Sequence, residues 1–503
     1  MDKNKFSGLS MDIEATEREK LAVVFPQCFS EGKLDIDKLL NLCGEYIDED
    51  FEKYKFEWKG KAECHRIAGK RSTGTLRPIT AESVNFDTTK NLYIEGDNLE
   101  VLKLLQTSYY RKVKMIYIDP PYNTGNDFVY NDDFTDPIAH YKEIIGMATK
   151  SNPETMGRFH TAWLNMMWPR LRLAHNLLRD DGVCFVSIDS HEIHNLRKLM
   201  DEIFGEENFV SDFIWQRAYS PKNDAKYVSN SQDYVLMYAK SIQDFQIGRL
   251  PRTEEANARY ANPDNDPRGV WKSSDMSVKT YAPANDYPIT TPSGRVVEPP
   301  AGRCWRFSEK AFSERLADNR ISFGDDGNGV PRIKRFLHEL KNDGLVPQSI
   351  LFYKNVGHSQ EGAQELSKLI EMGGFDGPKP VRLISHLITL ANLEDDSIIL
   401  DFFSGSATTA HAVMQLNAED GGNRKFIMVQ IPEITDEKSE AHKAGYKNIC
   451  EIGKERIRRA GKKLVEESTD KENINNLDIG FKVLKLDTSN LQAWDTTPIT
   501  EVD

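Results

Sequence analysis

The chain lacks the features that would place it among metal-binding, disulfide-rich or membrane proteins. Its six cysteines are scattered and form no Cys-x-x-Cys pair, so neither a zinc site nor a disulfide framework is expected. No apolar run approaches the ~18 residues of a membrane helix. The N-terminal stretch MDKNKFSGLS has no apolar signal core. These absences predict a cytoplasmic protein with no membrane partner and no bound metal.

The chain also lacks an excess of positive charge. The 503-residue chain has a formal net charge of −13, which by itself does not favour a nucleic-acid binder. Acidic and basic residues are nearly balanced over residues 205–380, so the excess acid lies outside that span. The apolar content of 39% and the charged content of 28% are ordinary for a globular protein of two or three domains.

Two common nucleotide-binding fingerprints are missing. There is no GxGxxG stretch, which disfavours a nicotinamide cofactor, and no Gly-Lys-Ser/Thr of a P-loop follows the Gly/Ser loop. The stretch SIILDFFSGSATTAHAV nevertheless predicts a strand that ends in Asp401, a small-residue loop and then a helix. Gly405 lets the backbone approach a ligand, and a helix N-terminus attracts a carboxylate. The pattern suits a nucleotide-like ligand, although many α/β proteins use such loops only for packing.

The tetrapeptide DPPY, Asp119–Tyr122, is the most informative stretch that is present. An exocyclic amino group on a base can be gripped by acceptors for its hydrogens and by an aromatic ring. Asp119 offers a carboxylate, Pro120 a carbonyl and Tyr122 the ring. The two prolines fix φ and make the turn rigid. DPPY therefore predicts methylation of a base amino group, against the plainer alternative that Asp119 only caps a strand.

The order of predicted elements indicates an α/β fold. NLYIEGD and KMIYIDPPY read as strands joined by a helix, which implies a parallel sheet. Alternation of strands and helices stops within a span rich in Pro, Gly, Asn and aromatic residues, and returns near the C-terminus. The predicted parts are a helical or irregular extension (1–85), a DPPY half (86–206), an inserted module (207–375), and an FSGS half with a tail (376–503).

Together these blocks resemble the amino-group DNA methyltransferases that use S-adenosylmethionine. DPPY precedes FSGS, with a large insert between them, which is the order of the β group of adenine methyltransferases. The stretch DNLEVLKLLQTSYYRKVKMIYIDPPYNTGNDFVYNDDF resembles the modification subunit of type III restriction systems, as do WLNMMWPRLRLA and GFKVLKLDTSNLQAWD. The resemblance implies a circularly permuted, Rossmann-like, mostly parallel sheet with helices on both faces, plus an inserted α+β target recognition domain.

The resemblance also implies roles for individual residues. Asp119 and the Pro120 carbonyl would accept hydrogen bonds from an adenine amino group, and Tyr122 would stack on the adenine once it is flipped out of the duplex. Phe128 or Tyr130 would help to close the pocket, with core packing as an equal alternative. The implied catalytic group is Asp119, Pro120, Pro121 and Tyr122.

The implied cofactor site centres on the FSGS loop. Its residues would line the methionine part, Asp401 would bond the amino group of the cofactor or order the loop, and either Gln430 or Glu433 would hold the ribose. Asp97 would lie near the adenine of the cofactor. The full predicted set is Asp97, Lys379, Pro380, Asp401, Phe403, Ser404, Gly405, Ser406, Thr408, Gln430 and Glu433.

The insert is expected to read DNA. Its candidate contacts are Trp271, Arg303, Trp305, Arg306, Arg332, Lys334 and Arg335, each with an ordinary surface or core role as the alternative. The resemblance further implies double-stranded DNA as substrate, a homodimer, and a helicase-nuclease restriction subunit as partner.

The predicted function is sequence-specific adenine-N6 methylation of DNA. Methylation of cytosine N4 or of RNA stays open, although Asp119 favours adenine because cytosine-N4 relatives more often carry Ser there. A catalytically silent DNA-recognition subunit for a partner nuclease is the alternative from another class. Intact DPPY and FSGS blocks favour an enzyme.

Overall fold

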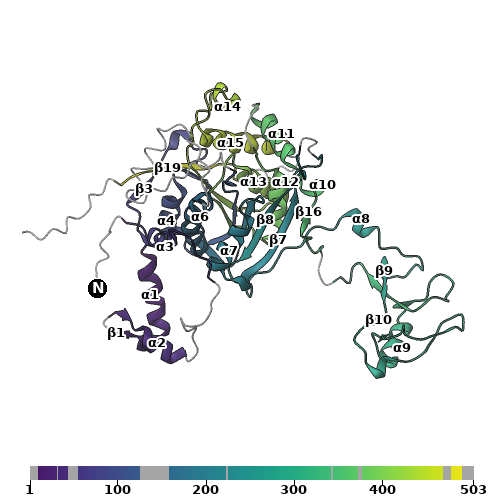
Figure 1. The fold of residues 1–503 in the computed structure, drawn as a ribbon. Coiled ribbons are helices and arrows are strands. Elements are labelled where there is room, and N and C mark those ends of the chain that lie inside the picture. The colour runs from purple at the N-terminus through teal and green to yellow at the C-terminus, as the bar shows by residue number, and fades with distance from the viewer. Residues whose placement is uncertain are drawn as a thin grey trace, which may run out of the picture. The chain divides into compact units, whose positions relative to one another are not determined.

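The chain folds into two compact units. The computed structural model describes residues 9–30, 32–43, 55–124, 158–221, 225–340, 344–371, 377–467 and 477–489. The first unit comprises residues 1–248 and 348–503, and the second comprises residues 249–347 (Figure 1).

A ten-stranded sheet forms the centre of the first unit, in the order β16-β7-β8-β6-β5-β17-β18-β4-β19-β3. Its strands are β3 (Gly74–Pro78), β4 (Leu92–Glu95), β5 (Val113–Ile118), β6 (Leu178–Ile188), β7 (Phe209–Gln216), β8 (Gln232–Ala239), β16 (Ile350–Leu351), β17 (Ile398–Asp401), β18 (Lys425–Gln430) and β19 (Lys482–Thr488).

The sheet is mostly parallel, as predicted. Strands β6, β5, β17, β18, β4 and β19 run parallel to one another. β8 runs antiparallel to both β6 and β7, and β3 antiparallel to β19. Strands from before and after the insert are interleaved in one sheet, with β17 and β18 between β5 and β4, so the permuted order of the blocks is compatible with one continuous sheet. Every residue of β5 is buried, as expected for a strand covered on both faces.

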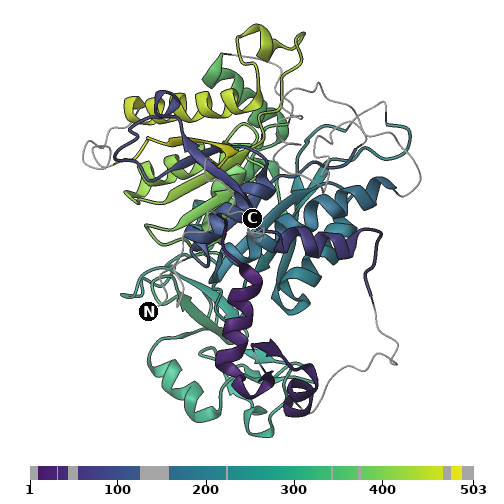
Figure 2. The ribbon, with the colours of Figure 1, turned by 90° about the vertical axis from the view of Figure 1, so that its left-hand side faces the viewer.

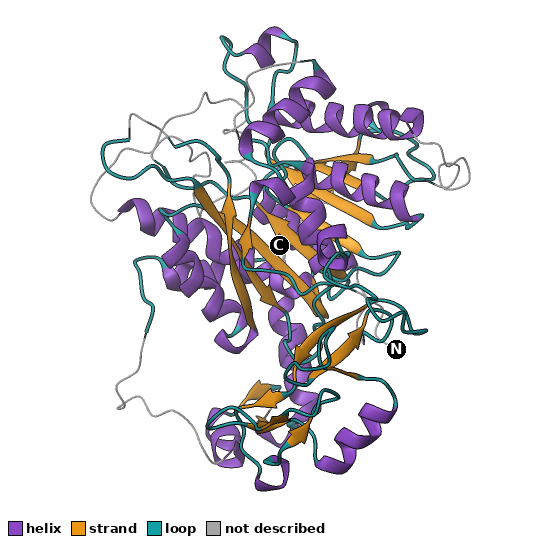
Figure 3. Ribbon diagram, turned by 90° about the vertical axis from the view of Figure 1, so that its right-hand side faces the viewer, coloured by secondary structure: helices purple, strands orange, loops and turns teal. Residues whose placement is uncertain are grey.

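Helices cover the sheet in two groups (Figures 2 and 3). One group packs around α6 and the other around α13. The helices of the first unit are α1 (Ile13–Val24), α2 (Ile36–Cys43), α3 (Lys61–Gly69), α4 (Asn98–Tyr109), α6 (Arg158–Leu177), α7 (Ile193–Phe204), α10 (Tyr353–Val356), α11 (Ser359–Ile370), α12 (Val381–Leu390), α13 (Thr408–Asp420), α14 (Glu440–Lys443) and α15 (Ile449–Glu467). Short strands β1 (Phe29–Ser30) and β2 (Lys33–Leu34) pair beside α2.

The second unit has its own hydrophobic core. Eight buried side chains form that core, among them Trp305, Phe312 and Ile333. Its strands are β9 (Trp271–Asp275), β10 (Ser277–Val278), β11 (Ile289–Thr290), β12 (Val296–Val297), β13 (Cys304–Trp305), β14 (Ile321–Ser322) and β15 (Arg332–Phe336), and its helices are α8 (Glu254–Asn257) and α9 (Glu309–Ala317). β15 pairs antiparallel with β14 and β9, so the unit is a small α+β module.

The compact second unit is narrower than the insert predicted at 207–375. β7 and β8 pair with each other, and β8 pairs with β6, so residues 209–216 and 232–239 extend the central sheet. β16 adds to the same edge and α11 packs on α15. At the other end, β3 belongs to the sheet although it falls within the predicted extension of residues 1–85. Within the described ranges, no helix is both long and apolar enough to cross a membrane.

Helix α4 contains a buried ion pair, and breaking that pair by substitution tests how far the stability of the first unit depends on it. Glu100 and Lys103 are one turn apart, bonded at 2.7 Å, with side chains only 3% exposed. Lys103→Met would leave a buried carboxylate unpaired and should lower the free energy of unfolding by about 3–5 kcal/mol. Urea denaturation followed by tryptophan fluorescence measures this change.

The matched control is the pair Glu440 and Lys443 on α14, which has the same spacing but side chains more than 60% exposed. Lys443→Met should change the free energy of unfolding by less than about 1 kcal/mol. Equal effects of the two substitutions would contradict the role given to the buried pair.

Candidate active site at the carboxyl edge of the central sheet

The two informative loops meet at one edge of the sheet. DPPY directly follows β5, and the FSGS loop directly follows β17. β5 and β17 are hydrogen-bonded parallel neighbours, with Leu400 opposite Ile116. Parallel neighbours end at the same edge, where ligands of open α/β sheets bind. The register therefore brings together loops that lie far apart in the sequence.

Two donors hold the Asp119 carboxylate. The Tyr122 hydroxyl donates to Oδ1 at 2.9 Å, and the Lys379 ammonium forms an ion pair with Oδ2. Burial, with the charges of Asp119 and Asp233, raises the pKa of Tyr122 well above its usual value, so its hydroxyl keeps the proton that it donates.

The rest of DPPY is fixed by packing. Pro120 is buried, and the Pro121 carbonyl accepts a hydrogen bond from Trp163 Nε1 on α6 at 2.8 Å. Asn123 closes the turn with a φ of 59°, a left-handed conformation that asparagine tolerates better than most residues. The turn thus holds Asp119 and Tyr122 in a single arrangement. Phe128 and Tyr130 lie outside the described residues.

Lys379 reaches Asp119 from the segment before α12. Its ammonium is 5.2 Å from the centre of the Tyr122 ring and 5.9 Å from that of Trp215, both within the range of cation–π attraction. Gly362 on α11 lets this segment pass, because a Cβ there would lie 2.2 Å from the Pro378 carbonyl oxygen. The resemblance placed Lys379 and Pro380 in the predicted cofactor site. The structure brings the Lys379 ammonium to the DPPY carboxylate, and Pro380 precedes α12 as its N-cap.

Asp401 orders the FSGS loop. Its Oδ1 accepts from the Phe403 amide at 3.1 Å and its Oδ2 from the Thr409 hydroxyl at 2.6 Å. Burial, with the nearby Asp119 charge, raises the pKa of Asp401 to about 7. Of the two roles predicted for Asp401, these bonds correspond to ordering the loop.

The loop then enters α13 through left-handed backbone. Ala407 has a φ of 61° and Gly405 a φ of 49°. Such a conformation costs about 1–2 kcal/mol for a residue with a Cβ, and the buried loop around Ala407 holds it there. An ideal Cβ on Gly405 would meet no atom within 4 Å. The backbone at Gly405 therefore faces open space beside the first turn of α13.

Gln430, at the end of β18, supports the same loop. Its side-chain oxygen accepts from the Gly405 amide at 2.7 Å, and its side-chain nitrogen donates to the Ile431 carbonyl at 3.3 Å. The amide of Gln430 is thus engaged with protein on both sides. Glu433, the other predicted ribose ligand, follows three residues later and is half-buried.

Asp97 caps α4 and accepts from the amides of Leu99 and Glu100. Its second oxygen forms a 3.1 Å ion pair with the fully buried Arg170. The neighbouring Asn98 donates to the Phe402 carbonyl at 2.7 Å. The start of α4 is in this way tied directly to the segment that leads into the FSGS loop.

Arg456 on α15 is a site residue that the sequence reasoning missed. It is fully buried, and its Nη1 donates to the hydroxyls of Ser406 at 2.9 Å and Thr408 at 2.7 Å. Burial lowers its pKa to about 10. The available signal was its spacing, since Arg456 lies four residues from each of the buried Ile452 and Ala460, on the apolar face of the helix.

The loop fits a ligand that has a carboxylate and a nucleotide-like body. Arg456 Nε and Nη2 are buried without a hydrogen-bond partner among the described residues. The first turn of α13 offers further N–H donors, with favourable potential for an anion. Open space at Gly405 lets a ligand approach the backbone closely. Phe403 and Ser404 are buried in the same loop.

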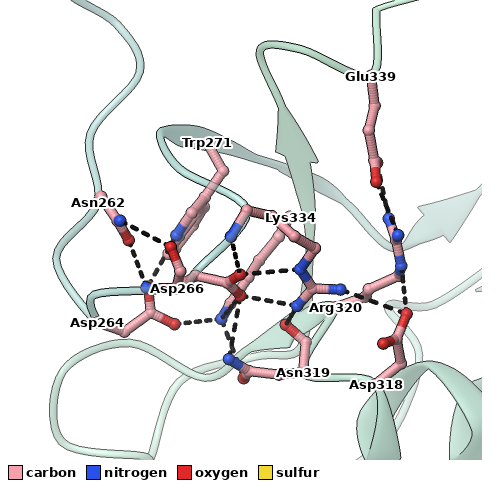
Figure 4. Close-up of polar contacts among 10 residues, drawn as sticks. Asn262, Asp264, Asp266, Trp271, Asp318, Asn319, Arg320, Lys334 and Glu339 are labelled. Carbon is pink, nitrogen blue, oxygen red and sulfur yellow. Dashed lines mark hydrogen bonds and ion pairs between the residues drawn. The ribbon is translucent and has the colours of Figure 1, made fainter.

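In the second unit, three of the predicted DNA contacts are buried, and Figure 4 shows two of them, Lys334 and Trp271, with their polar partners. Lys334 forms ion pairs with Asp264 and, at 3.6 Å, with Asp266. Trp271 Nε1 donates to Asp264 at 2.8 Å. Trp305 lies in the core and donates to the Tyr287 carbonyl at 2.8 Å. The burial and bonding of Trp271, Trp305 and Lys334 therefore fit the alternative to DNA contact, an ordinary role in the core of the unit.

The other predicted contacts are more accessible. Arg303 donates to Ser277 at 3.1 Å, and Arg332 forms a 3.3 Å ion pair with Asp275. Arg306 and Arg335 are exposed and line a groove of about 670 Å³.

Arg335 also lies directly opposite Lys272 in the register of β15 and β9. Neither Arg335 nor Lys272 has an ion-pair partner within the described part of the unit. Like charges placed opposite each other destabilise a sheet. Their pairing suits the binding of an anion at this surface.

Comparison with known proteins agrees with this geometry. Residues 113–448 match the model of a DNA methylase family. The chain is 38% identical to the StyLTI Mod subunit of Salmonella typhimurium, over 89% of this chain and 68% of that protein. It is 32% identical to the EcoPI Mod subunit of Escherichia phage P1 (94% and 78% covered) and 31% identical to the EcoP15I Mod subunit of Escherichia coli (97% and 80% covered). All three are named as type III restriction-modification enzymes. The chain belongs to the DNA methylase family and, within it, to the Mod subunits of type III restriction-modification enzymes.

Proposed function

We propose that this chain transfers a methyl group from S-adenosylmethionine to N6 of a flipped adenine within a specific DNA sequence. The observation that carries the proposal is the pairing of β5 with β17. That pairing places a fixed carboxylate, Asp119, beside a loop suited to the methyl donor.

Asp119 and the Pro120 carbonyl accept the two hydrogens of the adenine amino group, and Tyr122 stacks on the base. Acceptors on both hydrogens favour a pyramidal nitrogen, whose lone pair then points at the donor. The cofactor supplies an electrophilic methyl group on a sulfonium. Asp119 also stabilises the positive charge that develops on the nitrogen, an effect strongest in a preorganised and water-poor site. Transfer is a direct displacement with no covalent enzyme intermediate.

The cofactor is held by the FSGS loop and its supports. Phe403, Ser404 and Gly405 line its methionine part, and Ser406 and Thr408 sit at the helix N-terminus that faces its carboxylate. Asp401 and Gln430 hold the loop in shape through the hydrogen bonds described above. Glu433 is then the candidate for the ribose hydroxyls, because the amide of Gln430 is already engaged. Asp97 remains the candidate near the adenine of the cofactor.

The second unit, residues 249–347, is the proposed target recognition domain. It is compact, has its own core, and interrupts the methyltransferase unit between the DPPY and FSGS halves. Arg306, Arg335 and Lys272 are its proposed phosphate contacts, with Arg303 and Arg332 as secondary ones. As in the type III systems to which it is similar, we propose that the chain forms a homodimer and joins a restriction subunit that carries the nuclease.

The direct test of this function is Asp119→Ala. Long-read sequencing that detects modified bases, applied to DNA from cells expressing the wild-type chain, should reveal N6-methyladenine at one short asymmetric site. Asp119→Ala should reduce the methylation rate by roughly 10²- to 10³-fold, the scale of removing a preorganised catalytic group. Asp212→Asn, at an exposed position on β7, is the matched control and should methylate normally.

Unchanged methylation by Asp119→Ala would contradict the proposal. A wild-type protein that binds one DNA sequence and leaves every base unmodified would support the silent DNA-recognition alternative. Modification of cytosine N4 in place of adenine would support the alternative that the chain is a cytosine-N4 methyltransferase.

A salt titration tests the DNA surface of the second unit. Replacing Arg335 and Lys272 together by Gln should lower the slope of log Kd against log salt concentration by about 0.9 for each of two lost phosphate contacts. Arg332→Gln is the control on the same strand. Because Arg332 is already paired with Asp275, its loss should change the slope less. If the double variant keeps the wild-type slope, the proposal that Arg335 and Lys272 contact DNA phosphates would be wrong.

A further inference from the structure

A second buried carboxylate lies beside the Asp119–Lys379 ion pair. Asp233, on β8, is 4% exposed and pairs with Arg217 at 3.0 Å. The two paired atoms are close but lack the alignment of a hydrogen bond. Because β8 runs antiparallel to β6, with Ile188 opposite Tyr234, the beginning of β8 lies at the edge where β5 and β6 end. Asp233 is therefore at the same edge as DPPY.

The strand register directs Asp233 toward Lys379. Asp233 is opposite Trp215 on β7, and side chains of such a pair share one face of the sheet with Cβ atoms about 4.5–5.5 Å apart. The Trp215 ring is the one that lies 5.9 Å from the Lys379 ammonium. Lys379 lowers the pKa of Asp233 and Asp119 raises it, so the three charges interact. The ammonium thus has Asp119 in contact and Asp233 as a second acidic neighbour.

The ion pair competes with the proposed substrate. Tyr122 already donates to one oxygen of Asp119, and Lys379 contacts the other. An adenine amino group must donate to that same carboxylate. A carboxylate has about four acceptor sites, so the amino group can still donate to it, but the ammonium competes with the reacting nitrogen for the negative charge of Asp119. That charge stabilises the positive charge on the nitrogen fully only when the ammonium yields its place, and a buried ammonium needs another anion to receive it.

We propose that Asp233 is a positioning residue that receives the Lys379 ammonium when the adenine amino group donates to Asp119. The inference rests on the proposed function of Asp119. No covalent bond forms or breaks, and the ammonium keeps its three protons. Arg217 holds Asp233 in place at one side, and Lys379 completes its pairing only in the substrate complex.

The proposal predicts a pH dependence. The groups that face Asp233 are Tyr117, Asp119 and Tyr122 from β5 and the turn after it, Asp189 after β6, Arg217 after β7, and Lys379. Burial raises the pKa of Asp233 to about 6. Above that pH the carboxylate is ionised and can hold an ammonium, and below it the carboxyl is neutral and cannot. The single-turnover methylation rate should therefore fall as the pH drops below about 6.

The test uses Asp233→Asn in the full-length chain, with S-adenosylmethionine and plasmid DNA carrying the site mapped in the Asp119 experiment. The single-turnover rate at pH 7.5 should fall by roughly 10- to 100-fold, the scale for one lost charge-assisted interaction. The Kd values for cofactor and DNA should stay within about twofold of wild type. The loss of rate below pH 6 should disappear. Asp212→Asn on the neighbouring strand is the matched control.

A double-mutant cycle separates positioning from a general structural role. If Asp233 acts through Lys379, then Asp233→Asn should cost nothing further in a Lys379→Met background. Additive losses, or a wild-type rate and pH profile for Asp233→Asn, would overturn the proposal.

If Asp233→Asn has a low melting temperature, its loss of rate could reflect unfolding. Asp233→Glu, which keeps the charge, is then the variant that tests the proposal. If Asp233→Glu recovers part of the rate and shifts the pH at which the rate falls, the result would support the proposal. If that pH stays at the wild-type value, the proposal would be overturned. Methylation retained by Asp119→Ala would instead show that the underlying function is wrong.

Discussion

The parallel pairing of β17 with β5 is the constraint on which the site depends. The two strands come from opposite sides of a long insert, and only their register puts the DPPY turn and the FSGS loop at one edge. β18 and β4, the next strands along, bring Gln430 and Asp97 to that edge. The order in which the chain supplies these strands is unimportant to the chemistry, because the sheet alone decides which loops are neighbours.

Charge is concentrated at this edge. Asp401, Lys379 and Arg170 are buried, and Asp119 and Asp97 are half-buried. Asp401 is satisfied by the loop that it orders, Asp119 by Tyr122 and Lys379, and Asp97 by Arg170 and the start of α4. Burying such groups costs several kcal/mol each unless partners are fixed in place. Arg456, Asp233 and its ion-pair partner Arg217 are partial exceptions, since each keeps at least one buried atom without a hydrogen-bond partner within the described structure. Buried polar atoms without hydrogen-bond partners are expected where a bound ligand supplies the missing partners.

Local signals in the sequence were enough to predict the central elements. An apolar run before an acid identified β5 and β17, and the sequence pattern identified the helices α4 and α13, because these patterns are set by neighbours in the chain. Long-range pairing was not predictable in the same way. Residues 209–239 look like part of the insert until β8 is seen to pair with β6. The polar composition around β8 hides an edge of the central sheet.

The same distinction applies to the site residues. DPPY and FSGS are contiguous motifs and were found, whereas Arg456, Asp233 and the contact of Lys379 with Asp119 depend on segments far apart in sequence. Lys334 was expected to contact DNA because of its charge, yet Asp264, 70 residues away, pairs with it in the interior. A cation's role depends on which acid the fold brings to it.

The most direct test of the account is a crystal structure of the chain with a non-reactive analogue of S-adenosylmethionine. The amino-acid part of the analogue should lie against residues 403–408, and the group that replaces the methyl should face the Asp119 carboxylate. An analogue bound elsewhere, or bound at the loop with that group turned away from Asp119, would contradict the claim that the pairing of β5 with β17 creates the active site.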